Sequence, residues 1–192
     1  MSKKRYALRI PNKANGIRLQ CSLPVREQGW WARRWLGIVE SMCVGARLGK
    51  GRNYAVSGQI THFQVDATKV IASVMGARPK PYDVAISFRR PEGDARKKII
   101  KSLKSEVITV ARLLAGDLPL EVEEAFRAHG FSFFPGGKIS PGCYDMTLSC
   151  SCPDYANPCK HIAAVLYVLG EEISRRPLTL MELRGISVED LL

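Results

Sequence analysis

Two cysteines separated by one residue, followed by a Cys-x-His pair, constrain this 192-residue chain more than any other feature. The four residues are Cys150, Cys152, Cys159 and His161, in the segment CSCPDYANPCKH. Closely spaced Cys and His residues in a chain of this size usually bind a metal, whereas disulfide frameworks are typical of small secreted domains. Three soft sulfurs and one imidazole nitrogen favour zinc, and four protein ligands complete its tetrahedral shell. The sequence therefore predicts one zinc ion with a structural role, because no position is left for an activated water.

The other three cysteines lie apart from this cluster. Cys21, Cys43 and Cys143 need no disulfide partner in a chain of this length, and we expect them to be buried small apolar residues. Cys143 lies seven residues before Cys150, but the four-ligand set is complete without it. Chance clustering and a redox-sensing thiol group are the alternatives to zinc for the four clustered residues.

The residues around the cluster predict a strand before it and a helix after it. Residues 144–150 alternate apolar and polar side chains, as in a strand. Asn157 and Pro158 suit the N-cap and the first position of a helix. Cys159 then lies at a helix N-terminus, which stabilises the negative charge of a thiolate. Lys160 offsets the net charge of minus one that three thiolates, a neutral imidazole and a divalent ion carry together.

The predicted helix after His161 decides whether the zinc unit itself is expected to read DNA. Its sequence, IAAVLYVL, is apolar nearly all round until Gly170, which is typical of a helix in a core. A helix that reads base edges presents Arg, Asn, Gln or Lys instead. We therefore expect zinc to fix the corner between strand and helix, and any ligand to contact the loop 153–160 or surfaces elsewhere.

The spacing Cys-x-Cys, a variable gap and Cys-x-His resembles that of the SWIM-type zinc fingers, and the likeness extends into the apolar helix. More widely, the segments WWARRW, GRNYAVSG, LLAGDLP and LRGISVEDLL look like those of prokaryotic SWIM proteins, which are often encoded beside Snf-type DNA-translocating ATPases. The resemblance implies an accessory protein that binds nucleic acid, with DNA expected, or a protein such as that ATPase, or both. The competing interpretation is a protein–protein adaptor with a structural zinc and no nucleic-acid binding.

Hydrophobic periodicity and turn residues predict the elements that precede the zinc unit. A helix begins at Trp30 and ends at the glycines of segment 45–51. A three-strand meander follows, and the period then returns to helical after Pro91. The predicted strands are 54–64, 69–75, 82–88, 131–134 and 144–150, and the two later helices are 91–116 and 119–129.

The net charge of +11 lies mainly in the first part of the chain. Residues 1–52 hold twelve Lys or Arg against two acidic residues, a net of +10, so the remainder carries +1. Such a segment commonly attracts DNA or RNA, and the alternative is a solvated tail that aids solubility.

Two basic surfaces and one zinc-flanking lysine are the predicted nucleic-acid contacts. One surface combines Arg33 and Arg34 with a run of tryptophans, although core packing is the expected role of Trp31 and Trp35. The second lies at the helix after Pro91, where residues 89–104 carry a net charge of +5 and could follow phosphates or form a solvated face. The predicted contacts are Arg33, Arg34, Arg89, Arg90, Lys97, Lys101, Lys104 and Lys160.

Composition and missing motifs exclude several classes of protein. The hydrophobic fraction of 46% predicts a folded protein rather than a disordered one. No apolar run approaches a membrane span and the start lacks a secretory signal, so we expect no membrane contact and a cytoplasmic location. We find no catalytic constellation, so we expect neither enzymatic activity nor a small-molecule substrate.

Together these features predict an α+β protein. A small antiparallel sheet packs with helices, and a zinc-stapled, ββα-like unit follows near the C-terminus. The expected organisation is a basic extended arm over 1–29, an α+β domain over 30–134 and a zinc-binding unit with C-terminal helices over 135–192.

Overall fold

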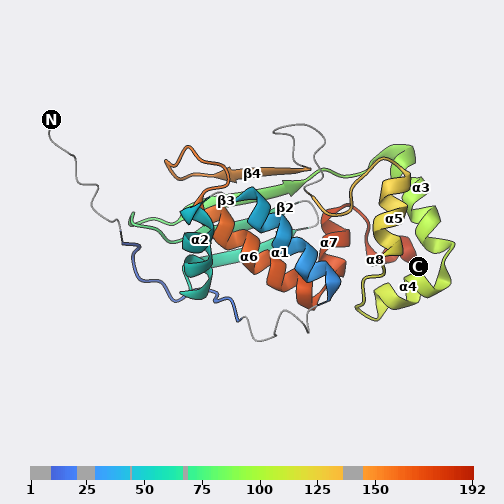
Figure 1. Ribbon diagram of the computed structural model, residues 1–192, viewed down its shortest axis with the longest axis horizontal. Helices are drawn as coiled ribbons and strands as arrows, with labels where there is room; N and C mark the ends of the chain where they lie inside the picture. The colour runs from blue at the N-terminus through green and yellow to red at the C-terminus, as the bar shows by residue number, and fades with distance from the viewer. Residues whose placement is uncertain (1–9, 21–28, 44, 67–68, 136–144) are drawn as a thin grey trace.

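The computed structural model describes residues 10–20, 29–43, 45–66, 69–135 and 145–192. Over these residues the chain forms one four-stranded antiparallel sheet and eight helices, which confirms the predicted α+β class (Figure 1).

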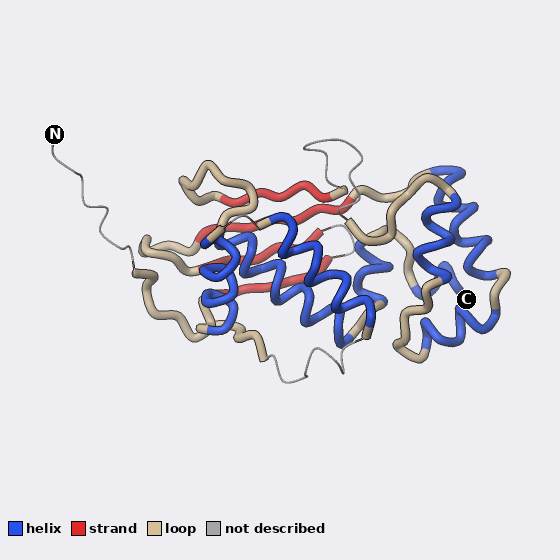
Figure 2. The backbone as a smooth tube through the Cα atoms, in the orientation of Figure 1, coloured by secondary structure: helices blue, strands red, loops and turns tan. Residues whose placement is uncertain are grey.

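The sheet has the simple strand order β1-β2-β3-β4, and the strands lie side by side in Figure 2. Its strands are β1 (Ile60–Asp66), β2 (Lys69–Val74), β3 (Tyr82–Phe88) and β4 (Met146–Cys150). The first three form the expected meander, and β4 returns from far along the chain to pair with β3 from Val84↔Cys150 to Phe88↔Met146. Alternate residues of β2 and β3 are buried, so one face of the sheet is apolar.

Three helices cover this apolar face: α1 (Trp30–Met42), α2 (Ala46–Val56) and α6 (Lys160–Arg175) (Figure 1). The central helix is α6, which packs on both α1 and α2 and has nine buried residues. Trp35 of α1 is buried and donates a hydrogen bond from Nε1 to the carbonyl of Leu166 at 3.0 Å. The expected core role of Trp35 and the expected burial of the apolar helix are therefore observed.

The helix that begins at Trp30 ends at Met42, shortly before the glycine-rich segment 45–51, but residues 46–51 of this segment then form the first part of a new helix, α2. The reason for glycine at position 51 is a close approach between helices. A Cβ atom on Gly51 would lie 2.5 Å from Cβ of Ala163 in α6, so only glycine fits there. Gly170 has the same role inside α6, which continues to Arg175, because its missing side chain makes room for the ring of Trp35. These glycines serve packing rather than helix termination.

Two glycines of α2 give a matched test of this packing. We expect Gly51→Ala to lower the free energy of unfolding by about 1–3 kcal/mol, because the new methyl group overpacks the contact with Ala163. We expect Gly49→Ala to raise it by about 0.5–1 kcal/mol, because no atom lies within 4 Å of its Cβ position and alanine favours the helix. Urea unfolding of both variants measures the difference. A gain in stability for Gly51→Ala would contradict the packing argument.

A second group of helices lies beyond the end of the sheet (Figure 1). These are α3 (Gly93–Lys104), α4 (Val107–Leu114), α5 (Glu121–Ala128) and α8 (Val188–Leu191). The short helix α7 (Leu178–Leu183) connects α6 to α8. The single helix predicted over 91–116 is wrong, because it is broken at Ser105, whose Oγ donates to the carbonyl of Ser102 at 2.7 Å. The break changes the phase of the apolar side chains. Val107 and Ile108, the first residues of α4, are therefore 77% and 75% exposed.

The strand predicted over 131–134 is also wrong. Phe133 and Phe134 are consecutive and both buried, whereas a strand would send neighbouring side chains to opposite faces. The segment instead packs its two rings against each other at 5.2 Å between centroids and ends in a turn.

A buried arginine joins three segments next to this turn. The Arg184 side chain has no exposed surface; its Nη1 donates to the carbonyl of Arg89 at 2.6 Å and its Nη2 to the carbonyl of Ser132. Its Nη2 also lies 3.3 Å from Oδ2 of the buried carboxylate of Asp145, directly before β4. Arg184 thus connects the residue after β3, the loop after α5 and the residue before β4.

Part of the predicted N-terminal arm lies against the sheet. In segment 10–20, Ile17 forms an antiparallel bridge with Ile60, and the amide of Leu19 donates to the carbonyl of Ala55 at 2.9 Å. The rest of the arm, residues 1–9 and 21–28, lies outside the described residues. The division of the chain into three regions stays a prediction. Within the described ranges, no helix is both long enough and apolar enough to span a membrane.

Candidate metal centre

The four predicted ligands meet at the corner between β4 and α6. Cys150 is the last residue of β4, Cys152 follows in the loop, and Cys159 and His161 lie at the start of α6. Their ligand atoms all lie within 4.8 Å of one another. The Sγ atoms of Cys150 and Cys159 each lie 3.8 Å from Nδ1 of His161, so Nδ1 is the nitrogen that faces the sulfurs.

These distances agree with the dimensions of a zinc site. Bonds of about 2.3 Å to sulfur and about 2.0 Å to nitrogen in a tetrahedron separate the two ligand atoms by about 3.5 Å. Three sulfurs and one imidazole nitrogen are also a typical structural zinc set, and their number leaves no open position. The cluster therefore fits one structural zinc ion, held by Cys150, Cys152, Cys159 and His161.

Electrostatics within the cluster favour a thiolate at Cys159. Hydrogen bonding from Cys150 is the main cause that lowers the pKa of Cys159 to about 4, and His161 and the backbone N–H of Ile162 contribute. The same interaction with Cys159, together with burial, raises the pKa of Cys150. Cys159 is the N-cap residue of α6, so its sulfur lies where the helix dipole stabilises negative charge. This residue offers a metal cation a thiolate that is already stabilised.

Two tyrosines pack against the His161 ring, Tyr82 in a tilted and Tyr54 in an edge-to-face arrangement. The ring centroid of Tyr82 lies 4.6 Å from the imidazole and that of Tyr54 lies 5.4 Å from it. Gly76 makes room for this arrangement, since a Cβ atom there would lie 2.5 Å from the Tyr82 ring and 3.3 Å from Nε2 of His161. These two rings restrict the orientation of the imidazole, which keeps Nδ1 directed at the sulfurs.

The start of α6 differs from the prediction by two residues. Asn157 was expected to cap the helix, but Cys159 is the N-cap and Lys160 is the first helical residue. The Asn157 side chain instead donates from Nδ2 to the carbonyl of Leu148 at 2.9 Å. This bond holds the loop against the free edge of β4. It thereby stabilises the metal corner, by which we mean the junction of β4 and α6 that carries the four ligands.

Of the other cysteines, Cys43 is buried as expected, and burial raises the pKa of its thiol to about 11. Cys21 and Cys143 lie outside the described residues.

The predicted nucleic-acid contacts do not form one surface. Arg33 and Arg34 lie on α1, and Arg34 pairs with Glu123 of α5 at 3.4 Å. Arg89 lies over the Phe131 ring, while Arg90 is half-buried and donates from Nε to the carbonyl of Leu183 at 3.4 Å. Both arginines of the 89–90 pair thus have contacts within the fold.

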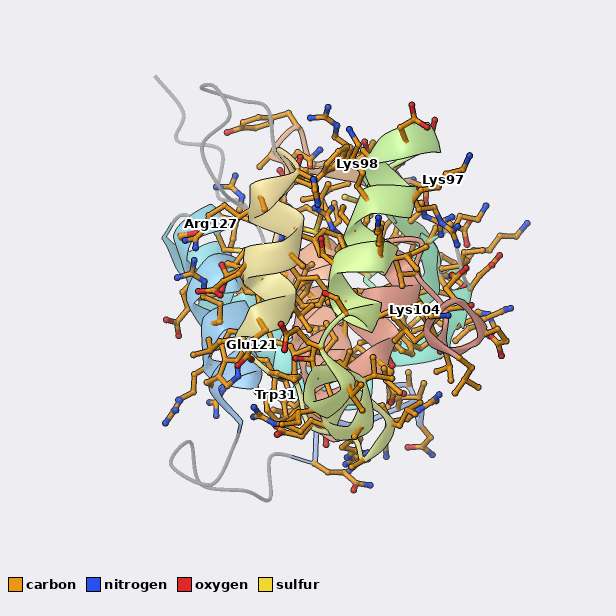
Figure 3. The ribbon with its side chains drawn as sticks, turned by 90° about the vertical axis from the view of Figure 1, so that its right-hand side faces the viewer. Trp31, Lys97, Lys98, Lys104, Glu121 and Arg127 are labelled. Carbon is orange, nitrogen blue, oxygen red and sulfur yellow. The ribbon has the colours of Figure 1, made fainter. Side chains whose placement is uncertain are left out.

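The predicted lysines lie at opposite ends of the molecule (Figure 1). Lys97, Lys101 and Lys104 are exposed on α3, where Figure 3 shows Lys97 and Lys104 together with Lys98. Lys160 lies beside the metal corner, half-buried, with Nζ 5.6 Å from the centroid of the Tyr54 ring. α3 and the metal corner are therefore two separate basic regions.

Sequence reasoning missed several residues that complete the metal corner. Tyr54 and Tyr82 lie far from the ligands in sequence, and no local pattern indicates that they pack against His161. Arg47 of α2 is also missed; its Nη2 lies 3.8 Å from Oδ1 of Asp154 in the loop between the ligands. In the sequence, only the positive charge of Arg47 pointed to a role in binding. Its place on a helix beside the metal site was not foreseen, because the segment that contains it was expected to be a loop.

The fold and the ligand set together define a zinc-stapled α+β protein in which a strand and a core helix share one metal. Residues 143–170 match the SWIM zinc finger model, so the chain carries a SWIM zinc finger, as its sequence resemblance implied. Its match begins just before β4 and ends within α6, which are the two elements that supply the ligands.

The uncharacterized protein Rv2102 of Mycobacterium tuberculosis is a relative over nearly the whole chain. It is 37% identical over 177 residues, which cover 92% of this chain and 62% of the relative. This chain thus spans about three fifths of the length of that relative. No solved structure gives a significant match.

Proposed function

We propose that this protein is a non-enzymatic, zinc-stabilised accessory protein that binds nucleic acid, with DNA as the expected ligand. The observation that carries this proposal is a row of four exposed lysines on α3: Lys97, Lys98, Lys101 and Lys104.

The α3 lysines have no carboxylate partner among the described residues. Among those residues every ion pair with a carboxylate is made by an arginine, and none involves a lysine. Lys101 and Lys104 lie in the last turn of α3, where the helix dipole favours a cation, whereas Lys97 and Lys98 lie in its second turn, where the dipole has little effect. Exposed cations without a carboxylate partner are suited to an external anion.

The spacing of these lysines suits the phosphates of a nucleic acid. Lys97, Lys101 and Lys104 are four and three residues apart and share one side of the helix. Seven residues extend about 10 Å along a helix axis. Each strand of duplex DNA carries one charge per about 3.4 Å of its axis, so the row can follow about three phosphates.

The zinc finger has a different role in this proposal. Its helix α6 is largely buried against α1 and α2, so it is not placed to enter a groove. Zinc holds β4 and α6 together, and recognition is left to surfaces outside the helix.

Salt dependence tests the proposal. We expect duplex and single-stranded DNA to bind at low salt and to lose affinity steeply as salt rises, because phosphate contacts release counterions. Replacing Lys97, Lys101 and Lys104 together with Gln is expected to reduce the slope of log K against log salt for duplex DNA by about 2 to 3. Fluorescence anisotropy of labelled DNA measures both slopes.

The matched control removes the same charge from exposed arginines that already have carboxylate partners. Arg127, Arg175 and Arg176 pair with Glu124, Glu171 and Glu172. Their joint replacement with Gln should leave the slope nearly unchanged. An equal effect of both triple variants would mean that only net charge matters, and no binding at low salt would refute nucleic-acid binding.

A second candidate function, the protein–protein adaptor, is favoured by the outer face of α4. Val107 and Ile108 are 77% and 75% exposed, and Leu114 on the same helix is also exposed. Arg112 is the one charged residue within this helix. Such an apolar face suits a protein partner, and the resemblance to SWIM proteins encoded beside Snf-type ATPases makes that ATPase the expected one. An adaptor of this kind would bind the ATPase but no DNA at low salt.

A further inference from the structure

The loop between the zinc ligands Cys152 and Cys159 presents an unusual side chain, Tyr155, which is 95% exposed. An aromatic ring so fully in water gains no burial energy from the fold. The loop is nevertheless held in place. The metal ligands Cys152 and Cys159 flank it. The Asp154 carboxylate accepts a hydrogen bond from the backbone amide of Ala156 at 3.1 Å, and the Asn157 side chain donates one to the carbonyl of Leu148 in β4. A ring on such a loop is already positioned, so ordering it on binding costs little conformational entropy.

Arg47 of α2 contacts this loop, and further cations lie on α2 and at the start of α6. The guanidinium carbon of Arg47 lies 6.0 Å from the centroid of the Tyr155 ring. Arg47, Lys50 and Tyr54 are three and four residues apart and so lie along one side of α2. Lys160 of α6 lies over Tyr54. Tyr54 follows Arg47 by seven residues, which is about 10 Å along the axis of α2.

The local charge balance leaves this surface positive. Asp154 is the carboxylate next to Tyr155, and it is already paired with Arg47 at 3.8 Å. Lys50 is exposed, and neither Lys50 nor Lys160 has a carboxylate partner among the described residues. Nε of Arg47 is buried and has no hydrogen-bond partner among them either. The surface therefore combines a free aromatic face with cations that are not fully satisfied within the fold.

We propose that Tyr155, with Arg47, Lys50 and Lys160, forms a site for an unpaired base and its neighbouring phosphates in single-stranded nucleic acid. This site rests on the proposed nucleic-acid binding and adds a second surface to the α3 lysines. Aromatic rings stack on unpaired bases while cations contact the backbone, which is how proteins bind single strands without reading their sequence. In a duplex the base faces are already stacked, so the Tyr155 ring has no partner there.

The test compares short oligothymidine with a duplex, using the zinc-loaded full chain at low salt. Tyr155→Ala is expected to weaken binding of the single strand about tenfold and to leave duplex binding within about twofold. Tyr155→Phe is the matched control, because it keeps the ring and removes only the hydroxyl, and it should bind like the wild type. Folding is not expected to limit the test, since Tyr155 is almost fully exposed; zinc content and thermal unfolding of both variants verify this.

The outcomes separate this inference from the proposed function. Wild-type binding to both DNAs with no effect of Tyr155→Ala on the single strand would overturn the stacking site alone. An equal loss on single strand and duplex would also overturn it, because stacking on a base predicts a difference. Absence of wild-type binding to either DNA would overturn the proposed function and the site together.

Discussion

Replacing Cys159 with Ala is expected to abolish stoichiometric zinc binding and to unfold most of the protein at ordinary temperature. Structural zinc sites release about 10–16 kcal/mol on binding, which is as large as the whole stability of a typical domain, about 5–15 kcal/mol. In this chain the metal joins the last residue of β4 to the N-terminus of α6, the helix at the centre of the core. Loss of one ligand therefore loosens both the sheet edge and the core helix.

Elemental analysis of the purified protein and thermal unfolding followed by circular dichroism measure this result. Cys43→Ala is the matched control, because Cys43 is a buried cysteine outside the ligand cluster and should keep one zinc per chain. His161→Ala should behave like the Cys159 variant, and a strong chelator should reproduce the unfolding in the wild type. Full zinc retention in both ligand variants would contradict the assignment.

Arg184→Met is expected to lower the free energy of unfolding by about 3–5 kcal/mol. Removing one member of a buried ion pair leaves the other charge without compensation, and that cost exceeds the value of the pair itself. Arg184 and Asp145 are both buried, 3.3 Å apart, and the variant also frees the carbonyls of Arg89 and Ser132. Three chain segments lose their common contact at once.

A double-mutant cycle and an exposed control make this prediction specific. Arg89 lies 3.9 Å from the same Asp145 carboxylate but is 61% exposed, so Arg89→Met should cost no more than about 1 kcal/mol. Adding Asp145→Asn to Arg184→Met should restore part of the stability, because the uncompensated carboxylate disappears. Urea unfolding of five proteins measures these terms: the wild type, Arg184→Met, Asp145→Asn, the double variant and Arg89→Met. A loss for Arg184→Met as small as that for Arg89→Met would show that the buried pair has little influence.

Elements with a clear local period could be predicted from the sequence. The strand over 82–88 corresponds to β3 (Tyr82–Phe88), and the helix that begins at Trp30 begins there in the structure. Predictions that assigned a local meaning to a residue used for a distant contact were wrong. Gly51 lies in the segment that was predicted to end a helix, whereas its missing side chain admits Ala163.

The candidate site divides in the same way. All four zinc ligands lie within twelve consecutive residues, so their spacing alone indicated the metal, and the structure brings the same four together. The residues that support them come from α2 and β3, about 70 to 110 positions earlier in the chain. No local pattern could reveal that Tyr54 and Tyr82 pack against His161 or that Arg47 contacts the loop between the zinc ligands.

The sequence by itself determined the α+β class, the zinc ligands and the core character of the helix behind them, because each depends on residues that are close along the chain. Only the tertiary structure decided which cations are free and which side chains meet. It separated the lysines of α3 from Lys160, paired Arg34 with Glu123, and buried Arg184 beside Asp145. The physical reason is that ion pairing and burial depend on contacts between distant segments, which form only when the sheet and its helices pack together.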